Sequence, residues 1–145
     1  MTTLNQQAAA IVSEHHGVHA MTDVTGFGLM GHGREMAMAS KVVLEIETGA
    51  VPRISGALEA IALGAVPGGL MANRQYAECV VSDAPSSRIE DNLRTLMYDP
   101  QTSGGLLISV APVSAGSLVE ALAGAAVPAA RIGRVVEGKP GIVLH

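Results

Sequence analysis

Asp23 is the acidic residue of this sequence whose surroundings are best suited to chemistry. Thr22 and Thr25 flank it, and Gly26 and Gly28 follow just before a predicted helix. A carboxylate at this position can cap the helix by accepting backbone N–H bonds. It can also hold Mg²⁺, which takes oxygen ligands and is usually bound by one or two carboxylates together with substrate phosphates. Spacing alone favours the cap and leaves the metal site open.

Two further loops combine glycines with short polar residues. One is Pro-Gly-Gly at 67–69, and the other is Asp-Pro-Gln-Thr-Ser-Gly-Gly at 99–105, which contains Thr102, Ser103 and Gly104. Such loops often approach a ligand with backbone N–H groups, although the same residues also make ordinary tight turns. Gly104 and Gly105 precede a predicted buried strand, where a Cβ would hinder close approach of the backbone. We expect the hydroxyls of Thr102 and Ser103 to face a cleft and not the core of this domain.

One glycine pattern in the chain imitates a nucleotide-binding motif. Gly26-x-Gly28-x-x-Gly31 matches the dinucleotide fingerprint, and Glu45 or Glu47 lies about 20 residues further on, where a ribose-binding acid is expected. The fingerprint has to follow a buried parallel strand directly. Residues 20–25 instead contain an acid and two hydroxyl residues, so dinucleotide binding is not expected.

The histidines and the single cysteine offer weaker candidates. His15 and His19 have the i,i+4 spacing that could bind zinc on one helix face, but no third ligand is apparent, and a solvated helix end is favoured. Cys79 precedes two valines and has no adjacent base, so we interpret it as a small buried hydrophobic residue. Catalysis by Cys79 is therefore not expected.

Hydrophobic periodicity predicts the elements that position these residues. We expect helices at 4–16, 29–39, 54–62, 87–98 and 114–124, and strands at 42–47, 79–81, 106–110, 131–136 and 142–144. Residues 17–28 and 64–73 are predicted as loops, the first with room for a short strand. Ser87-x-x-Glu90 predicts a capping box for the fourth helix, and residues 137–141 predict a hairpin between the last two strands. The alternation indicates an α+β fold.

Composition limits the possible functions. The 145 residues are expected to form a single domain, and the net charge of −4 with one Phe, two Tyr and no Trp argues against nucleic-acid binding. Glycine, proline or charge interrupts every apolar stretch, so no membrane-spanning helix is expected. Residues 1–7 have neither a charged nor an apolar region, so no signal peptide is expected. A single cysteine fits a reducing, cytoplasmic location.

Three segments resemble motifs of one enzyme family. Residues 22–32, Thr-Asp-Val-Thr-Gly-Phe-Gly-Leu-Met-Gly-His, and residues 98–107, Tyr-Asp-Pro-Gln-Thr-Ser-Gly-Gly-Leu-Leu, are similar to two motifs of the selenophosphate synthetases, also called selenide, water dikinases. Residues 64–69, with Asn73 and Tyr76, resemble a third motif in the same order. The resemblance covers essentially the whole chain but only the C-terminal half of such an enzyme.

The resemblance implies a fold and a role. The fold is that of the C-terminal domain of aminoimidazole ribonucleotide synthetase, with a mixed sheet covered by helices. The whole enzyme makes selenophosphate, AMP and phosphate from ATP, selenide and water, and its catalytic residues lie in an N-terminal domain that this chain lacks. Asp23 corresponds to a Mg²⁺ ligand contributed by the C-terminal domain.

The same resemblance implies partners and cofactors. Mg²⁺ and ATP would be shared with the N-terminal domain of the same enzyme, and the full-length enzyme would be a homodimer. The residues expected to contact the cofactor are Thr22, Thr25, Gly26, Gly28, Thr102, Ser103 and Gly104. Ala72 stands where many family members have an arginine. The alternative is a stand-alone module of the same fold that binds a nucleotide or a partner.

Overall fold

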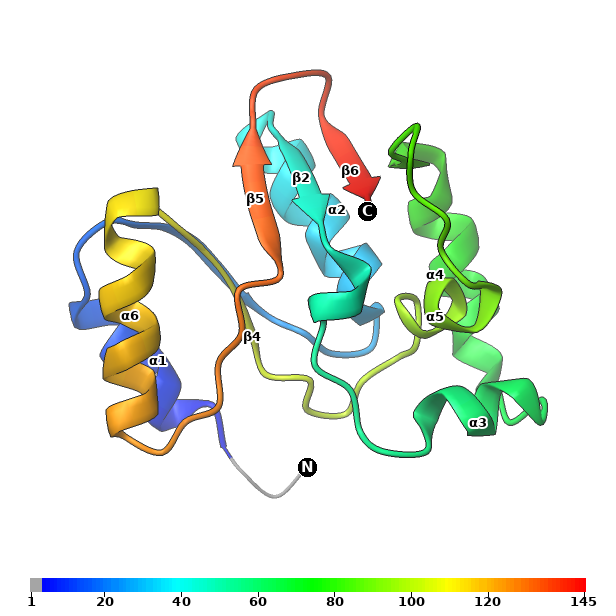
Figure 1. Ribbon diagram of the computed structural model, residues 1–145, viewed down its shortest axis with the longest axis horizontal. Helices are drawn as coiled ribbons and strands as arrows, with labels where there is room; N and C mark the ends of the chain where they lie inside the picture. The colour runs from blue at the N-terminus through cyan, green and yellow to red at the C-terminus, as the bar shows by residue number, and fades with distance from the viewer. Residues whose placement is uncertain (1–3) are drawn as a thin grey trace.

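A computed structural model describes residues 4–145 of the chain (Figure 1). Six α-helices, two 3₁₀ turns and six strands follow one another: α1 (Gln6–Glu14), β1 (Val18–Asp23), α2 (Gly28–Ser40), β2 (Val43–Ile46), η1 (Thr48–Ala50), α3 (Ala57–Ala62), α4 (Gly68–Ala77), η2 (Glu78–Val80), β3 (Val81–Asp83), α5 (Asp91–Leu96), β4 (Leu106–Val110), α6 (Pro112–Gly124), β5 (Gly133–Val136) and β6 (Gly141–Leu144). The α+β class predicted from the sequence is confirmed. Residues 1–3, which begin the segment used to argue against a signal peptide, lie outside the described residues.

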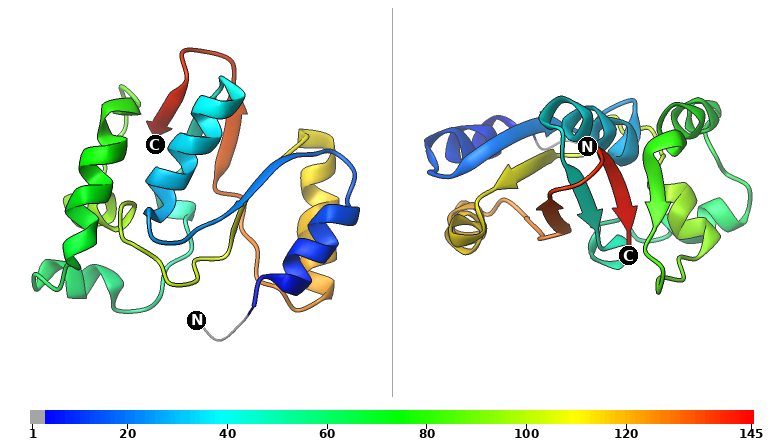
Figure 2. Two further views of the ribbon diagram at one scale, coloured as in Figure 1. Left: turned by 180° about the vertical axis from the view of Figure 1, so that it is seen from behind. Right: turned by 90° about the horizontal axis from the view of Figure 1, so that it is seen from above.

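The strands form two sheets. Strands β1 and β4 make an antiparallel two-stranded ribbon, and the other four strands form a mixed sheet in the order β3-β6-β2-β5. Strand β2 pairs parallel with β6 and antiparallel with β5, and β3 pairs parallel with β6. Seen from above, the four strands of the mixed sheet lie side by side, and the ribbon extends from them toward α1 and α6 (Figure 2). Helices α1 and α6 lie at one end of the molecule, and α3, α4 and α5 lie at the other (Figure 1).

Each sheet has its own hydrophobic core. Val12 of α1 packs with Leu118 and Leu122 of α6 against the ribbon. The larger core lies between the four-stranded sheet and helices α2, α4 and α5, and its buried members are Met30, Ala37, Leu44, Ile46, Leu70, Ala77, Met97, Tyr98, Ile142 and Leu144. Short aliphatic side chains dominate both cores, as the scarcity of aromatic residues requires.

Helix α4 was missed, and strand β1 was only partly anticipated. Helix α4 begins immediately after Pro67, in a segment predicted as loop. Its buried residues Leu70, Asn73 and Ala77 follow helical spacing, but the polar Asn73 hid that pattern. Strand β1 is a strand of six residues, with a register shift between Val18 and Ala20, where a loop with a short strand was expected. The strand predicted at 79–81 is wrong at its first two residues, because residues 78–80 form the 3₁₀ turn η2 and β3 begins at Val81.

The predicted hairpin between the last two strands is wrong. Strands β5 and β6 do not pair with each other, because β2 lies between them. The nearly continuous burial of β6 suits a central strand, whereas β5 carries the exposed residues Arg134 and Val135 and occupies the edge. A sequence of two strands with a short link cannot reveal a third strand inserted between them.

The predicted capping box is also wrong. Helix α5 begins at Asp91 with Glu90 as its N-cap, and the start of the helix has no side-chain capping hydrogen bond. The Ser87 hydroxyl instead donates to the backbone carbonyls of Ala84 and Leu144, at 2.9 and 3.1 Å. The serine therefore ties this loop to the end of β6, and that tertiary contact replaces the local cap. Within residues 4–145, no helix is both long and apolar enough to cross a membrane.

Candidate functional site

The loops that follow β1 and precede β4 are joined by backbone hydrogen bonds. The amide of Val24 donates to the carbonyl of Gly105, and the amide of Gly104 donates back to Val24, both at 2.9 Å. The amide of Gln101 donates to the carbonyl of Thr25 at 3.0 Å. These bonds continue the β1–β4 pairing past the ends of the strands. The first two motif segments of the sequence therefore lie against each other.

Asn73 of α4 joins the third motif segment to the other two. Its side-chain Nδ2 donates to the carbonyl of Gly26 at 2.8 Å and to that of Tyr98 at 3.1 Å. The residue is only 6% exposed, so the two bonds form in a protected environment. Sequence reasoning included Asn73 only through the family resemblance and did not identify this role.

The close approach of the two loops requires glycine at two positions. Gly28 has a φ of +67°, and a Cβ there would lie 2.8 Å from the carbonyl oxygen of Asp99. A Cβ on Gly104 would lie 2.8 Å from the carbonyl oxygen of Val24. Gly26 differs, because nothing lies within 4 Å of a Cβ built on it. Gly28 and Gly104 are thus explained by packing, whereas Gly26 faces open space.

Asp23 is the last residue of β1, and its side chain is exposed. Helix α2 begins with Phe27 as its N-cap and has no side-chain capping bond, so the interpretation of Asp23 as a helix cap is wrong. Within residues 4–145 its carboxylate has neither a hydrogen bond nor an ion pair. Asp23 lies opposite Leu106 in the ribbon, which places it beside the turn formed by Gly104 and Gly105.

The predicted hydroxyl residues divide into two groups. The hydroxyl of Thr25 lies 3.1 Å from Nε2 of His32, and that of Thr22 donates to the carbonyl of Asp23 at 3.3 Å. Thr102 is exposed and Ser103 is half-buried, and neither belongs to a hydrophobic core. The first pair stabilises the loop, and contact of the second pair with a ligand stays a prediction.

Asp99 is a second carboxylate in the same loop system, and the sequence analysis did not single it out. It is half-buried, and one of its oxygens accepts a hydrogen bond from Nε2 of Gln101 at 2.8 Å. Burial raises the pKa of the Asp99 carboxyl above its ordinary value, and the Gln101 bond opposes that change. Of these two carboxylates, Asp23 is exposed and Asp99 is partly protected.

The two weaker candidates are not confirmed. Helix α1 ends at Glu14, so His15 is its extended C-cap and His19 lies in β1. The two histidines therefore do not share a helix face, and Nε2 of His15 lies 3.2 Å from the Ser117 hydroxyl. Cys79 is exposed, contrary to the expected burial, because it lies in the 3₁₀ turn η2 and precedes β3. Across residues 4–145, no three His, Cys, Asp or Glu side chains gather as a metal site.

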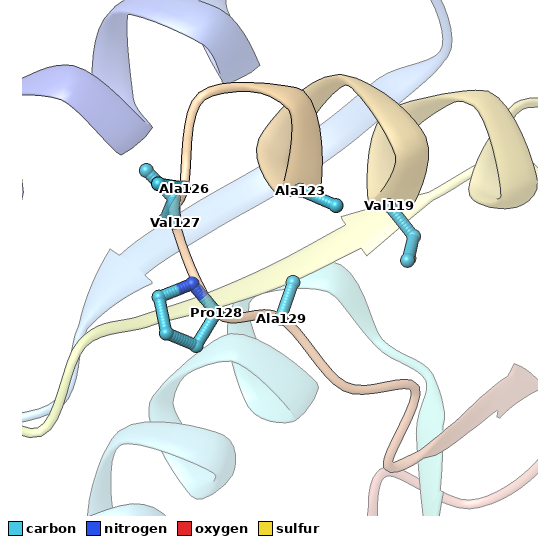
Figure 3. Close-up of a pocket in the computed structure, with 6 residues that line it drawn as sticks. All are labelled: Val119, Ala123, Ala126, Val127, Pro128 and Ala129. Atoms are coloured by element: carbon cyan, nitrogen blue, oxygen red, sulfur yellow. The ribbon is translucent and has the colours of Figure 1, made fainter.

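Two surface hollows lie away from these loops. One is apolar and lies at the end of α6, lined by Val119, Ala123, Ala126, Val127, Pro128 and Ala129 (Figure 3). Another is lined by residues 53–59, before and within α3. Neither includes Asp23 or the joined loops.

The chain belongs to the family described as "AIR synthase related protein, C-terminal domain", whose model matches residues 1–145. Among curated relatives it is 44% identical over 125 residues to a selenide, water dikinase of Caldanaerobacter subterraneus and 44% identical over 137 residues to one of Clostridioides difficile. It is 43% identical over 138 residues to one of Pseudomonas aeruginosa. The resemblance predicted from the motifs is confirmed.

These matches cover most of this chain but a minority of each relative. They include 84%, 94% and 94% of this chain, and 34%, 38% and 38% of the three relatives. The chain therefore spans just over a third of the length of the curated relatives it matches.

A solved structure confirms the fold. The chain resembles thiamine-monophosphate kinase from Stenotrophomonas maltophilia with a TM-score of 0.53 at 19% identity. The likeness covers 88% of this chain and 31% of that protein. At this identity the comparison concerns the fold alone, and it agrees with the mixed sheet and helices described above.

Proposed function

We propose that this chain is the C-terminal domain of an enzyme that makes selenophosphate from selenide, ATP and water, with AMP and phosphate as the other products. The relatives named selenide, water dikinase support this reaction. The observation that carries the proposal is the exposed carboxylate of Asp23, which pairs with no described residue and lies beside two glycine-rich loops bonded to each other.

Asp23 fits the role of a Mg²⁺ ligand by its donor chemistry. Mg²⁺ prefers carboxylate oxygen and commonly combines one or two protein carboxylates with phosphate oxygens and water. An exposed carboxylate without a cation partner meets that requirement, and one carboxylate alone leaves the rest of the coordination to groups outside this chain. Bound Mg²⁺ would neutralise charge on the phosphates of ATP.

The surrounding residues hold Asp23 and the ligand-facing backbone in place. Asn73 fixes the loop at Gly26, and Gly28 and Gly104 allow the two loops to touch. Gly26 faces open space, so a ligand can approach its backbone. Thr102 and Ser103 lie outside the cores and are proposed to contact the ligand.

The chain is proposed to be inactive alone. Its relatives are about two and a half times as long as this chain. We propose that the remaining length supplies the catalytic residues and the other Mg-ATP ligands as an N-terminal domain, that the complete enzyme is a homodimer, and that it works in the cytoplasm.

The first experiment changes Asp23 in the longer protein that carries this chain. Asp23→Asn should lower the rate of selenide-dependent selenophosphate formation, followed by ³¹P NMR, by at least about tenfold, or about 1.4 kcal/mol in activation free energy. Asn keeps the size but lacks the charge that holds Mg²⁺. Asp91→Asn, at an exposed aspartate on α5, is the matched control and should leave the rate unchanged. An unaltered rate for Asp23→Asn at limiting Mg²⁺ would refute the assignment.

The second experiment uses the 145-residue chain alone. Calorimetric titration with Mg-ATP should give binding no tighter than about millimolar, because a single carboxylate binds Mg²⁺ weakly and the other ligands are missing. No ATP hydrolysis should be detected. Micromolar binding at one site would contradict the shared site and support a stand-alone nucleotide-binding module.

A further inference from the structure

Four side chains form a ladder across helices α2 and α4, which lie side by side (Figure 2). The ring centroids of His32 and Phe27 are 5.5 Å apart, and those of Phe27 and Tyr76 are 5.7 Å apart with an interplanar angle of 27°. The guanidinium carbon of Arg34 lies 4.1 Å from the centre of the Tyr76 ring. Phe27 and Tyr76 are 49% and 39% exposed, so the ladder reaches the surface.

Arg34 differs from the other arginines of residues 4–145. Three of them face acids, in the pairs Arg74–Glu78, Arg94–Asp83 and Arg134–Glu45. Arg53, Arg88 and Arg131 are exposed to solvent. Arg34 alone is half-buried without a hydrogen bond or an ion pair to a described residue, and its Nε is enclosed without a partner. The Arg34 guanidinium is thus kept in place by the Tyr76 ring but has no acidic partner among the described residues.

The neighbouring acids are engaged elsewhere. Oε2 of Glu35 lies 3.4 Å from Nδ1 of His32. Glu78, near the end of α4, accepts from Arg74 at 3.0 Å. The Tyr76 ring restricts the guanidinium to one orientation by a cation–π contact, so less rotational freedom is lost when its outer N–H groups bind an anion.

We propose that Arg34 binds an oxyanion of the phosphate type, through the N–H groups at the outer end of its guanidinium. Paired N–H donors in one plane match two oxygens of a phosphate, which is the geometry that Arg provides and Lys does not. The source of the oxyanion is either free phosphate or a phosphoryl group on a nucleotide. This site uses none of the residues assigned to Mg-ATP, and it does not depend on the proposed function.

Phe27 connects this oxyanion site to the loop of the candidate site. It lies between Gly26 and Gly28 in the chain, and its ring stacks on that of Tyr76. The Tyr76 ring in turn makes the cation–π contact with Arg34. Oxyanion binding at Arg34 should therefore change the surroundings of the Phe27 ring, which provides a second, independent signal.

The experiment is an NMR titration of the full chain at constant ionic strength. Inorganic phosphate is added in one series and AMP in another, without Mg²⁺, and the arginine Nε–H signals are followed. The enclosed Nε of Arg34 exchanges slowly with water, so its signal should be visible. We expect saturable shifts of the Arg34 and Phe27 signals with a dissociation constant of about 1 mM. Saturation by inorganic phosphate shows that the free ion is enough for binding. Saturation by AMP but not by phosphate shows that the site binds a phosphoryl group on a larger ligand.

Three variants make the result specific. Arg34→Gln should abolish the saturable shift at Phe27, and Arg34→Lys, which keeps the charge and contact with Tyr76, should weaken binding several-fold. Arg53→Gln, at an exposed arginine, is the matched control and should bind as the unmodified chain does. If Arg34→Gln does not fold, the Arg34→Lys titration decides. No saturable shift at Arg34 in either series, or an equal response in the Arg53 signal, would overturn the proposal.

Discussion

Replacement of Asn73 by alanine tests whether one amide holds the three motif segments together. The carbonyl of Tyr98 is buried and would lose its partner, at a cost of about 1–3 kcal/mol. The carbonyl of Gly26 belongs to an exposed residue and can bind water, so the loss there is about 1 kcal/mol. Asn73→Ala should therefore lower the free energy of unfolding by about 2–4 kcal/mol, or roughly 6–12 °C in melting temperature.

Urea unfolding followed by circular dichroism measures this effect. Gln75→Ala is the matched control, because it removes an amide from the exposed face of the same helix and should change the free energy by less than about 0.5 kcal/mol. The reasoning fails if Asn73→Ala costs less than about 1 kcal/mol, or no more than the control.

Asn73→Asp separates the hydrogen bonds from the shape of the side chain. At neutral pH a carboxylate would face the two carbonyl oxygens that Asn73 now donates to, and repulsion should raise the pKa of the new carboxyl in the folded state. A group whose folded pKa is raised contributes stability below its unfolded pKa and loses it as the pH rises. The variant should therefore be more destabilised at neutral pH than in mild acid, whereas Asn73→Ala should show the same deficit at both.

Two further predictions concern the same loops. Gly28→Ala should destabilise the chain by more than about 1 kcal/mol in urea unfolding, because of its φ of +67° and the 2.8 Å approach to Asp99, while Gly26→Ala should stay within about 1 kcal/mol. Burial raises the pKa of Asp99, so its carboxyl contributes stability in acid that is lost as the pH rises through the folded pKa. Asp99→Asn can still accept the hydrogen bond from Gln101 but does not titrate. The melting temperature of this variant should therefore fall less between acid and neutral pH than that of the unmodified chain.

Elements with local signals could be predicted from the sequence. The alternation at 42–47 and the apolar run at 106–110 correspond to β2 and β4, and the apolar spacing at 29–39 corresponds to α2. In each case the apolar pattern of one segment is enough to indicate the type of element, whatever it packs against.

Features that depend on distant segments could not be predicted in this way. Strand β2 lies between β5 and β6. The residues of each strand do not reveal which other strands pair with it. The Ser87 hydroxyl could satisfy a helix end or a distant carbonyl, and the carbonyl of Leu144 competes with the local cap.

The candidate site likewise has features that the sequence reveals and features that depend on distant segments. The motif residues of both loops were identified, because glycines and hydroxyls at high density are visible in sequence. Two properties of the site were not visible. One is the clamp by Asn73, whose two acceptors lie 47 and 25 residues away along the chain. The other is that Asp23 ends a strand and does not cap α2.

The position of Asp23 follows from how the ribbon is supported. A two-stranded ribbon alone is marginally stable, and here α1 and α6 cover it while the bonds between Val24 and the two glycines at 104 and 105 extend its pairing. The same bonds lie where the chain passes from the ribbon into α2 and from α5 back into the ribbon. A carboxylate on a free loop would sample many positions, whereas one at the end of a paired strand is held by the backbone on both sides. The junction between the two cores therefore fixes Asp23 before any metal or phosphate binds.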